Sequence, residues 1–377
     1  MKKIAILGGG ISGLYFANLL EKNKNYNYKI FERKSRFEID DGYGIQLSVN
    51  GIKLLNEIGF SNVETNSVSC PKKVIFYDAK NSYKICDIDI SKFNDENNRY
   101  TTLKRSTLFN FLLNNIPEKK IINNIELNKV TFKDKINLKF SNNNEETFDY
   151  VIVSDGVFSK TKSIMLNKDI RPKYFNSVAL RGSIKSFENN DISLYLGSNF
   201  HFLIYPVNQN KEFNFISIIK KDLHEDQINN QNYFKENSFI KKLIDEISLK
   251  TSIKLENKVK NLKSFPIFVS NSFNKPDTRN VFLVGDALYA FPPSFAQGAS
   301  QSIESSKEAY DEIENNTESY YIKRYEKIKK VNSRSMLNHF IFHLSSPFTL
   351  FVRNNFLKYL SKNNNFLENY LGKIYKN

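Results

Sequence analysis

The stretch Gly8-Gly9-Gly10-Ile11-Ser12-Gly13 decides the fold of this 377-residue chain. It has the spacing G-x-G-x-x-G and lies between a short apolar segment and a run of apolar residues at helical spacing. In such a loop Gly8 makes the tight turn, Gly10 lets the backbone approach a pyrophosphate, and Gly13 permits close packing of the helix on the strand. The stretch therefore predicts a strand, a phosphate-binding loop and a helix.

An acidic residue follows the loop at the expected distance. Glu32 ends the second predicted strand, 19 residues after Gly13, where a carboxylate can accept hydrogen bonds from both ribose hydroxyls of an adenosine. Arg33 stands beside it, and the first helical N–H groups, at Ile11 and Ser12, would face the phosphates. Only one such fingerprint occurs in the sequence, so we expect a single dinucleotide site.

The remaining hydrophobic pattern predicts an α/β protein whose dinucleotide-binding domain is interrupted. Short apolar runs predict buried strands at 136–140, 150–153 and 280–284. A helix is predicted from Gly298 onward.

The interruption is β-rich. Residues 73–90 alternate around a turn typical of a hairpin, and four segments between 176 and 220 predict an antiparallel meander. We expect a Rossmann-like domain formed by 1–70, 98–172 and 275–330, an inserted, mainly antiparallel β-sheet substrate domain formed by 71–97 and 173–274, and a helical C-terminus at 331–377.

The formal charge of +15 could indicate an anionic partner. Lysine, however, is spread along the chain, and no compact Lys/Arg block typical of nucleic-acid binding occurs. We therefore expect no nucleic-acid partner. From about Tyr320 the chain is helical and basic, with Phe-rich sequence at 340–356. These helices could contact a membrane surface weakly, or pack against the domains or a second subunit of a homodimer; a monomer is equally compatible.

Cys70 and Cys86 are the only cysteines, and their spacing fits neither a disulfide framework nor a metal site. The four histidines show no metal-ligand grouping, and we expect no metal. The first apolar run is too short for a signal peptide, and no stretch reaches the ~18 to 20 apolar residues that cross a bilayer. We expect a cytoplasmic protein.

Further motifs follow the Gly loop in order along the chain. Each is short, and Asp-Gly or Gly-Asp alone is common in turns, but here they also end predicted strands or begin predicted helices. They are Gly42-Tyr43-Gly44-Ile45-Gln46, Arg105, Asp155-Gly156, Gly285-Asp286, Pro292-Pro293 and Gln297-Gly298-Ala299. With the Gly loop and Glu32, they resemble the FAD-dependent aromatic-ring monooxygenases, the salicylate-hydroxylase-like branch of the p-hydroxybenzoate hydroxylase superfamily.

The resemblance implies FAD as the cofactor and assigns roles to these residues. Gln46 would pass beside the flavin, Arg105 would lie near the pyrophosphate and ribityl chain, and Asp286 would accept a hydrogen bond from a ribityl hydroxyl. Asp155-Gly156 would serve both FAD and NAD(P)H. The helix that begins at Gln297-Gly298 would direct its N-terminal amides at the flavin N1/O2 edge and favour the negative charge of reduced flavin.

The implied reaction is a monooxygenation. NADH or NADPH would reduce FAD, O2 would form a flavin C4a-hydroperoxide, and one oxygen atom would pass to a small aromatic substrate. For the substrate pocket we expect the sheet face with Arg181, Tyr205 and Pro206. Near the flavin we expect Tyr289 and the pair Pro292-Pro293.

Four departures from the family pattern put the substrate and the pyridine nucleotide in doubt. Tyr289 stands where many relatives have His, Val49 where Pro is frequent, Lys162 where Arg is usual, and Ser305 where Asp is usual. Two alternatives stay open: an isoprenoid or quinone-pathway reductase or hydroxylase on the same fold, and a flavoprotein without turnover.

Overall fold

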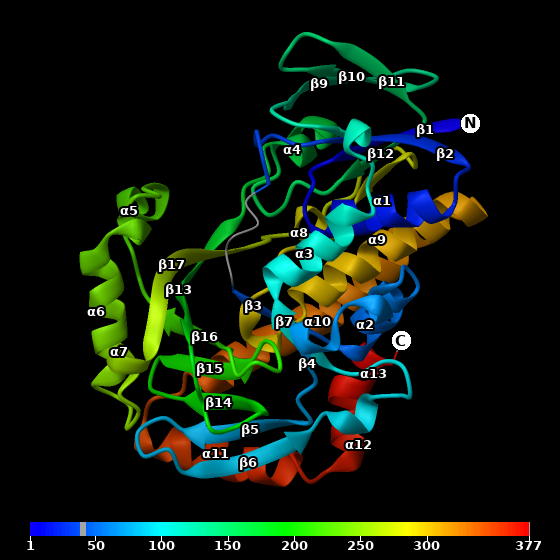
Figure 1. Ribbon diagram of the computed structural model, residues 1–377. Helices are drawn as coiled ribbons and strands as arrows, with labels where there is room; N and C mark the ends of the chain where they lie inside the picture. Colours follow the sequence, from blue (N-terminus) through cyan, green and yellow to red (C-terminus); the bar gives the residue numbers. More distant parts are fainter. Residues whose placement is uncertain (38–42, 377) are drawn as a thin grey trace.

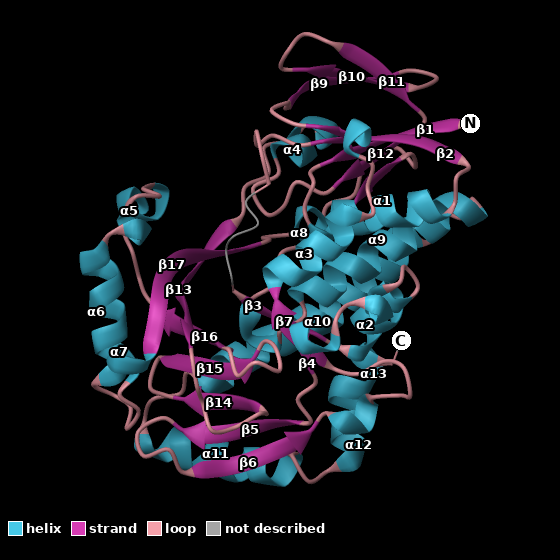
Figure 2. Cartoon of the chain, in the orientation of Figure 1, coloured by secondary structure: helices cyan, strands magenta, loops and turns pink. Residues whose placement is uncertain are grey.

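The computed structural model describes residues 1–37 and 43–376, arranged around two sheets (Figures 1 and 2). The first is a parallel sheet of five strands, whose central members are apolar and buried throughout their inner residues. Its order is β18 (Val281–Leu283), β12 (Tyr150–Val153), β1 (Lys2–Leu7), β2 (Tyr26–Phe31) and β8 (Ile121–Ile122). This confirms the predicted Rossmann-like sheet and the α/β class.

Both faces of the parallel sheet are covered. In Figure 1 the helices lie below it and a three-stranded antiparallel sheet lies above it. The Phe31 ring stacks on Phe140 of the upper sheet with centroids 4.3 Å apart, which joins the two layers. The helices are α1 (Ile11–Lys22), α3 (Arg105–Asn114) and α9 (Gly298–Asn315), and the upper sheet is β9 (Leu127–Phe132), β10 (Ile136–Phe140) and β11 (Glu145–Phe148).

The Gly loop has the geometry that its sequence predicts. Gly8 has φ +109°, a conformation that other residues rarely adopt. A Cβ on Gly13 would lie 2.1 Å from the Gly8 carbonyl oxygen, so α1 can approach β1 this closely only with glycine there. A Cβ on Gly10 would meet only the Ser154 oxygen, at 3.8 Å, which leaves the loop open above it.

The second sheet is mixed and has seven strands. The meander expected at 176–220 is only partly right: β14, β15 and β16 are antiparallel neighbours, but β13 pairs with β16, and β14 pairs in parallel with β5. The physical reason is that the hairpin at 73–90 joins this sheet from elsewhere in the chain. The order is β17 (Val259–Val269), β13 (Lys173–Ile184), β16 (Phe213–Lys220), β15 (Phe200–Pro206), β14 (Ile192–Leu196), β5 (Lys73–Asp78) and β6 (Lys84–Asp89).

One face of this sheet is closed and the other faces the molecule's interior. Helix α6 (Asn237–Ser248) packs Phe239, Leu243 and Ile247 against the closed face, where Phe202 and Phe215 lie. Because side chains alternate along a strand, the neighbouring residues point to the opposite face. That inner face becomes a wall of the candidate site.

The remaining elements connect and cover the two sheets. The boundary expected between residues 330 and 331 is wrong as a structural division, because α10 runs through it with Ile328, Val331 and Ser335 buried on one side. These elements are β3 (Gly44–Leu47), β7 (Thr101–Lys104) and β4 (Val68–Ser69) in a small sheet, and α2 (Val49–Asn56), α4 (Lys160–Leu166), α5 (Glu225–Asn229), α7 (Leu255–Lys258), α8 (Gly285–Leu288), α10 (Tyr320–Phe342), α11 (Pro347–Leu360), α12 (Asn364–Leu367) and α13 (Lys373–Tyr375). No helix in the described ranges is long and apolar enough to cross a membrane.

A buried polar network anchors the N-terminus of α9. Gln297 donates to the Ser48 hydroxyl at 3.0 Å, and Gln301 donates to Glu304 at 2.8 Å. Asn50 donates to the same Glu304 carboxylate at 3.0 Å. The network thereby ties the start of α9 to the β3–α2 connection.

Helix α10 supplies the cations of this network. Arg324, with only 1% of its side chain exposed, donates to Gln301 at 2.7 Å and lies 3.3 Å from Glu308. Lys327 lies 3.1 Å from Glu304. Positive charge from α10 therefore compensates the carboxylates that α9 buries.

We expect Arg324→Ala to destabilise the fold by about 3–5 kcal/mol, because it removes the cation beside Glu308 and the buried donor to Gln301, and leaves Glu304 with Lys327 as its one cation. The exposed pair Arg279–Glu318, with both side chains about 70% exposed, offers a matched control. Arg279→Ala should cost about 0–1 kcal/mol. Urea unfolding measures both changes, and equal losses for the two variants would contradict the role given to the network.

Candidate active site

A pocket of about 260 Å³ opens over the Gly loop. Gly8 and Gly10 form its floor, and Glu32 and Arg33 line one side. The Glu32 carboxylate accepts the Gly9 N–H at 2.8 Å, so the acidic side chain sits directly beside the loop. We call this space the outer pocket. Its loop, helix N-terminus and carboxylate suit the adenosine and phosphate half of a dinucleotide.

Asp155 and Gly156 lie on the opposite side of the outer pocket. Burial raises the pKa of Asp155, and its Oδ1 atom has no hydrogen-bond partner among the described residues. The same burial lowers the pKa of nearby Lys162, which Asp155 partly offsets. A buried carboxylate oxygen without a partner is costly, so a donor from a bound molecule would stabilise it. These residues fit a cofactor with hydroxyl or amide donors.

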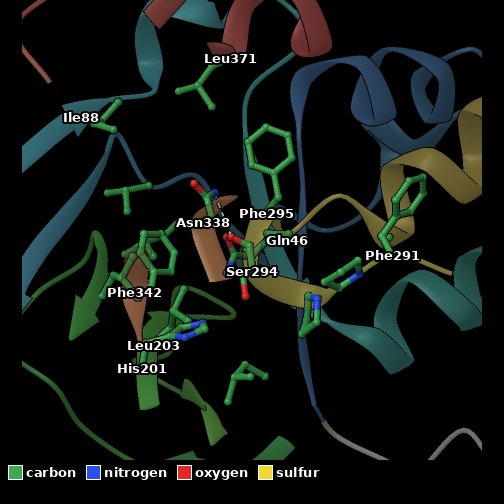
Figure 3. Close-up of a pocket in the computed structure, with 18 of the residues that line it drawn as sticks. Gln46, Ile88, His201, Leu203, Phe291, Ser294, Phe295, Asn338, Phe342 and Leu371 are labelled. Carbon is green, nitrogen blue, oxygen red and sulfur yellow. Dashed lines mark hydrogen bonds between the residues drawn. The ribbon is translucent and has the colours of Figure 1, made fainter. Parts of the chain in front are cut away.

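A second and larger cavity, of about 440 Å³, lies between the second sheet and the C-terminal helices. We call it the inner cavity. Figure 3 shows its side chains converging from several elements, with Gln46, Ser294 and Asn338 near its centre. Val157 lines it two residues after Asp155, so the connection after β12 touches both spaces.

The wall of the inner cavity formed by the second sheet is almost wholly apolar. Leu203 and Tyr205 of β15 and Ile216 and Ile218 of β16 point into it. The opposite wall comes from α10, α11 and α12. Its residues include Leu337, Asn338, Ile341 and Phe342 from α10, Phe356, Leu357 and Leu360 from α11, and Phe366 and Leu367 from α12.

The loop before α9 forms the third side. Pro292, Pro293, Gly298 and Ala299 line the inner cavity. A Cβ on Gly298 would meet nothing within 4 Å, so the first turn of this 18-residue helix is open toward a ligand. Its N-terminal amides can therefore stabilise negative charge in the cavity.

Asp286 lines the inner cavity where α8 begins. Its side chain is open to the cavity but lies deep in the molecule, and this burial raises its pKa to about 6. Gly285 has φ +59° and donates its N–H to Ser305 at 2.9 Å. Ser305 therefore positions the Gly285-Asp286 turn.

Other predicted site residues lie elsewhere or serve the framework. The Gln297 side chain turns into the buried network instead of the cavity. Tyr289 packs on Phe291 outside the inner cavity, and Pro206 does not line it either. The Arg105 guanidinium lies over the Phe109 ring, at 5.6 Å, and lines neither space.

The last predicted residues are Ile11 and Ser12 in the framework, Gln46 in the wall of the inner cavity, and Gly42. The N–H groups of Ile11 and Ser12 begin α1, and the Ser12 carbonyl accepts a hydrogen bond from Ser306. Gln46 lines the inner cavity and accepts the Tyr100 hydroxyl at 2.8 Å. Gly42 lies outside the described residues.

Arg181 lines the inner cavity beside an aromatic ring. Its guanidinium lies 5.4 Å from the centre of the Tyr43 ring, and Lys263 lies 5.7 Å from the same ring. Stacking of this kind orients a cation and disperses its charge. Arg181 is thus held in a fixed orientation in the wall of the inner cavity.

Three histidines that sequence reasoning left without a role form a chain of hydrogen bonds. Ser294 Oγ contacts His339 Nδ1 at 3.3 Å, His339 Nε2 contacts His343 Nδ1 at 3.1 Å, and His343 Nε2 contacts His201 Nδ1 at 3.0 Å. The imidazoles therefore lie in a row, and no group in residues 1–37 and 43–376 is arranged to hold a metal ion. The i, i+4 spacing of His339 in α10 and His343 at its C-cap was the available signal.

The hydrogen bonds between the three histidines all run in one direction, from His339 through His343 to His201. His343 Nε2 also contacts the Ile218 carbonyl at 3.2 Å, and a carbonyl only accepts, so this nitrogen carries the proton. His343 Nδ1 then accepts from His339, and His201 Nδ1 accepts from His343. In neutral His201 the remaining proton is on Nε2, and His201 lines the inner cavity.

The imidazoles are held neutral. Burial lowers the pKa of His339 to about 4 and that of His343 to about 3, and burial together with its His neighbours lowers the pKa of His201. At neutral pH the row therefore acts as a fixed set of dipoles. It offers an N–H donor to the inner cavity without bringing a charge.

Comparisons with known proteins agree with this architecture. Residues 6–38 match the family model of the NAD(P)-binding Rossmann-like domain. The FAD-dependent monooxygenase pigN of Monascus ruber is 27% identical over 242 residues, which cover 57% of this chain and 54% of that protein. The chain therefore aligns with about half the length of this relative.

Two solved structures are similar over the whole chain. A salicylate hydroxylase in complex with substrate gives a TM-score of 0.80 at 18% identity, with 100% of this chain and 95% of that chain covered. HpxO of Klebsiella pneumoniae, complexed with FAD and uric acid, gives 0.78 at 16% identity, with 100% and 96% covered. These likenesses show the shared fold. In sequence the chain is similar to a curated FAD-dependent monooxygenase, and in fold it is similar to an aromatic hydroxylase and to an FAD-binding protein.

Proposed function

We propose that this protein binds one FAD and uses NADH or NADPH and O2 to hydroxylate a small aromatic substrate. The observation that carries the proposal is the pair of spaces that the connection after β12 lines, with Asp155 in the outer pocket and Val157 in the inner cavity. The outer pocket has the loop and carboxylate suited to a dinucleotide, and the inner cavity is apolar and lies under the open N-terminus of α9. The relatives' names, which include an FAD-dependent monooxygenase, support the same reading.

The residues have separable tasks in this proposal. Glu32 would hold the adenosine ribose, the loop at Gly10 the pyrophosphate, and Asp286 a ribityl hydroxyl. When bound, the flavin supplies the redox chemistry, taking electrons from NAD(P)H and activating O2. The start of α9 would stabilise negative charge on the flavin ring.

The inner cavity would orient the substrate and exclude water. Its apolar walls at Leu203, Ile216 and Phe342 suit an aromatic ring, and His201 would donate its Nε2 proton in a hydrogen bond to a substrate oxygen. Exclusion of water strengthens that hydrogen bond and protects reactive species from side reactions.

Oxygen consumption tests the proposal directly. The purified holoprotein should consume O2 and NADH or NADPH when given a member of a panel of phenols, aromatic acids, pyridines and quinone precursors, with formation of a hydroxylated product. Reduction of a substrate without O2 would favour the isoprenoid or quinone-pathway reductase instead. Bound FAD with no stimulated oxidation would favour the flavoprotein without turnover.

We expect Glu32→Ala to purify with far less FAD, because loss of a charged hydrogen-bond partner costs about 1.5–3 kcal/mol. The ratio of flavin to protein absorbance measures the effect. Glu118→Ala, which removes an exposed carboxylate on the connection between α3 and β8, should keep the wild-type ratio. Full FAD retention by the Glu32 variant would contradict the assignment of Glu32 to the adenosine ribose.

FAD affinity should depend on the protonation of Asp286. Its pKa is about 6, and a ribityl hydroxyl would donate to the ionised form. Affinity should therefore be constant above this pKa and fall by up to about tenfold per pH unit below it. Fluorescence titrations with FAD between pH 5 and 8 measure this.

Asp286→Asn is the control for that pH dependence. Burial also raises the pKa of Glu308 to about 6, so this second carboxyl titrates in the same range and is retained in the variant. The Asn variant should bind FAD more weakly at pH 8 and show a flatter profile. Identical profiles for the two proteins would assign the titration to Glu308.

A further inference from the structure

Helix α11 is apolar on two opposite sides. Its inner side packs Leu357 against the β5–β6 edge of the second sheet, where Phe76 and Cys86 lie. Its outer side carries Phe348, Phe351, Val352, Phe356 and Tyr359, which are 49–75% exposed and follow helical spacing. A surface helix normally places polar residues outward.

The end of α10 also carries exposed apolar side chains. Met336, Leu337 and Phe340 are 46–62% exposed, although α10 buries its other side. Together with the outer side of α11 they make eight large exposed apolar side chains on two consecutive helices. We call this set the Phe face: Met336, Leu337, Phe340, Phe348, Phe351, Val352, Phe356 and Tyr359. Exposed apolar surface of this extent marks an interaction site.

The segment that carries the Phe face contains basic residues and no acidic ones. Residues 327–367 contain no Asp or Glu, whereas the average for the chain would place about four there. The same segment has seven cationic residues: Lys327, Lys329, Lys330, Arg334, Arg353, Lys358 and Lys362. Arg353 is buried and Lys327 is paired with Glu304, so five of these cations, Lys329, Lys330, Arg334, Lys358 and Lys362, lie at the surface. The surface is therefore complementary to one that is both apolar and anionic.

The Phe face adjoins the inner cavity. Leu337 and Phe356 are 46% and 49% exposed, and both also line the cavity. Between them Ile341 and Leu357 continue the cavity wall. Two side chains of the Phe face, one from α10 and one from α11, are therefore also part of the cavity wall. In Figure 1 α11 lies at the bottom, alongside β5 and β6 and far from the parallel sheet.

We propose that the Phe face is a docking surface for an anionic lipid bilayer. Acyl chains would receive the aromatic side chains of α11, and lipid phosphates would pair with the surrounding lysines. A bilayer supplies both properties in one partner. A bilayer would also bring an apolar phase to the end of the inner cavity beside the Phe face. A docked protein would instead close that end.

Docking would let an uncharged, lipid-dissolved substrate pass between α10 and α11 into the inner cavity. This consequence rests on the proposed function, because it assumes turnover in that cavity. The docking itself does not, and vesicle binding needs neither NAD(P)H nor substrate. If the protein binds vesicles but shows no turnover, the result contradicts the proposed function and leaves the docking proposal intact.

The absence of tryptophan from the sequence allows a clean test. Phe351→Trp places a single indole on the Phe face, and Phe132→Trp places one at an exposed position on β9, 46% exposed, in the opposite part of the molecule. The FAD content of each variant reports folding. Each holoprotein is mixed with phosphatidylglycerol–phosphatidylcholine vesicles, with pure phosphatidylcholine vesicles, and with vesicles containing brominated phosphatidylcholine.

We expect the Phe351→Trp emission to shift to shorter wavelength with the anionic vesicles and to be quenched by the brominated lipid, with Phe132→Trp unchanged. The double variant Phe348→Ser, Phe351→Ser should bind anionic vesicles roughly tenfold or more weakly in sedimentation. Equal binding by wild type and double variant would overturn the proposal, since net charge alone would then explain it. No shift with any vesicle, or a shift without vesicles that accompanies dimer formation in light scattering, would also overturn it.

Discussion

The buried polar network at the start of α9 is the interaction on which the candidate site depends. Glu304 is shared by Asn50, Gln301 and Lys327, which belong to three different segments. A carboxylate with so many partners fixes the distance and angle between those segments, because any displacement leaves a buried charge unsatisfied. The network therefore holds the helix N-terminus against the inner cavity, while the cavity itself contains few polar groups.

This arrangement explains which parts were predictable from sequence. The Gly loop, Glu32 and the strand at 150–153 follow from local patterns, because conformation at Gly8 and burial along β12 are properties of a few consecutive residues. The parallel pairing of β14 with β5 joins residues more than a hundred positions apart, and alternation does not encode the partner. The hydrogen-bonded row from Ser294 to His201 likewise could not be predicted from local sequence, because only the tertiary fold brings these residues together.

The same distinction applies to Gln297. Its place before a helix predicted a role at the flavin, and the helix start does lie at the cavity. Its side chain instead stabilises the framework by bonding Ser48. Sequence indicates which backbone must be near a ligand, but the direction of a buried polar side chain depends on the partners that the fold brings to it.

The C-terminal helices are part of the site, which changes how the chain is divided. Leu357 of α11 and Leu367 of α12 contribute to the wall opposite the second sheet, and Phe342 contacts both that sheet and the cavity. Without this wall the inner face of β5 and β14 would be exposed, because Phe76 and Leu194 pack there. Since the same helices carry exposed aromatic side chains outward, any surface that binds them also acts on the cavity wall. In the proposed docking, the helices that close the inner cavity would also carry the binding face, so that docking and access to the cavity would be coupled through direct contact between the two.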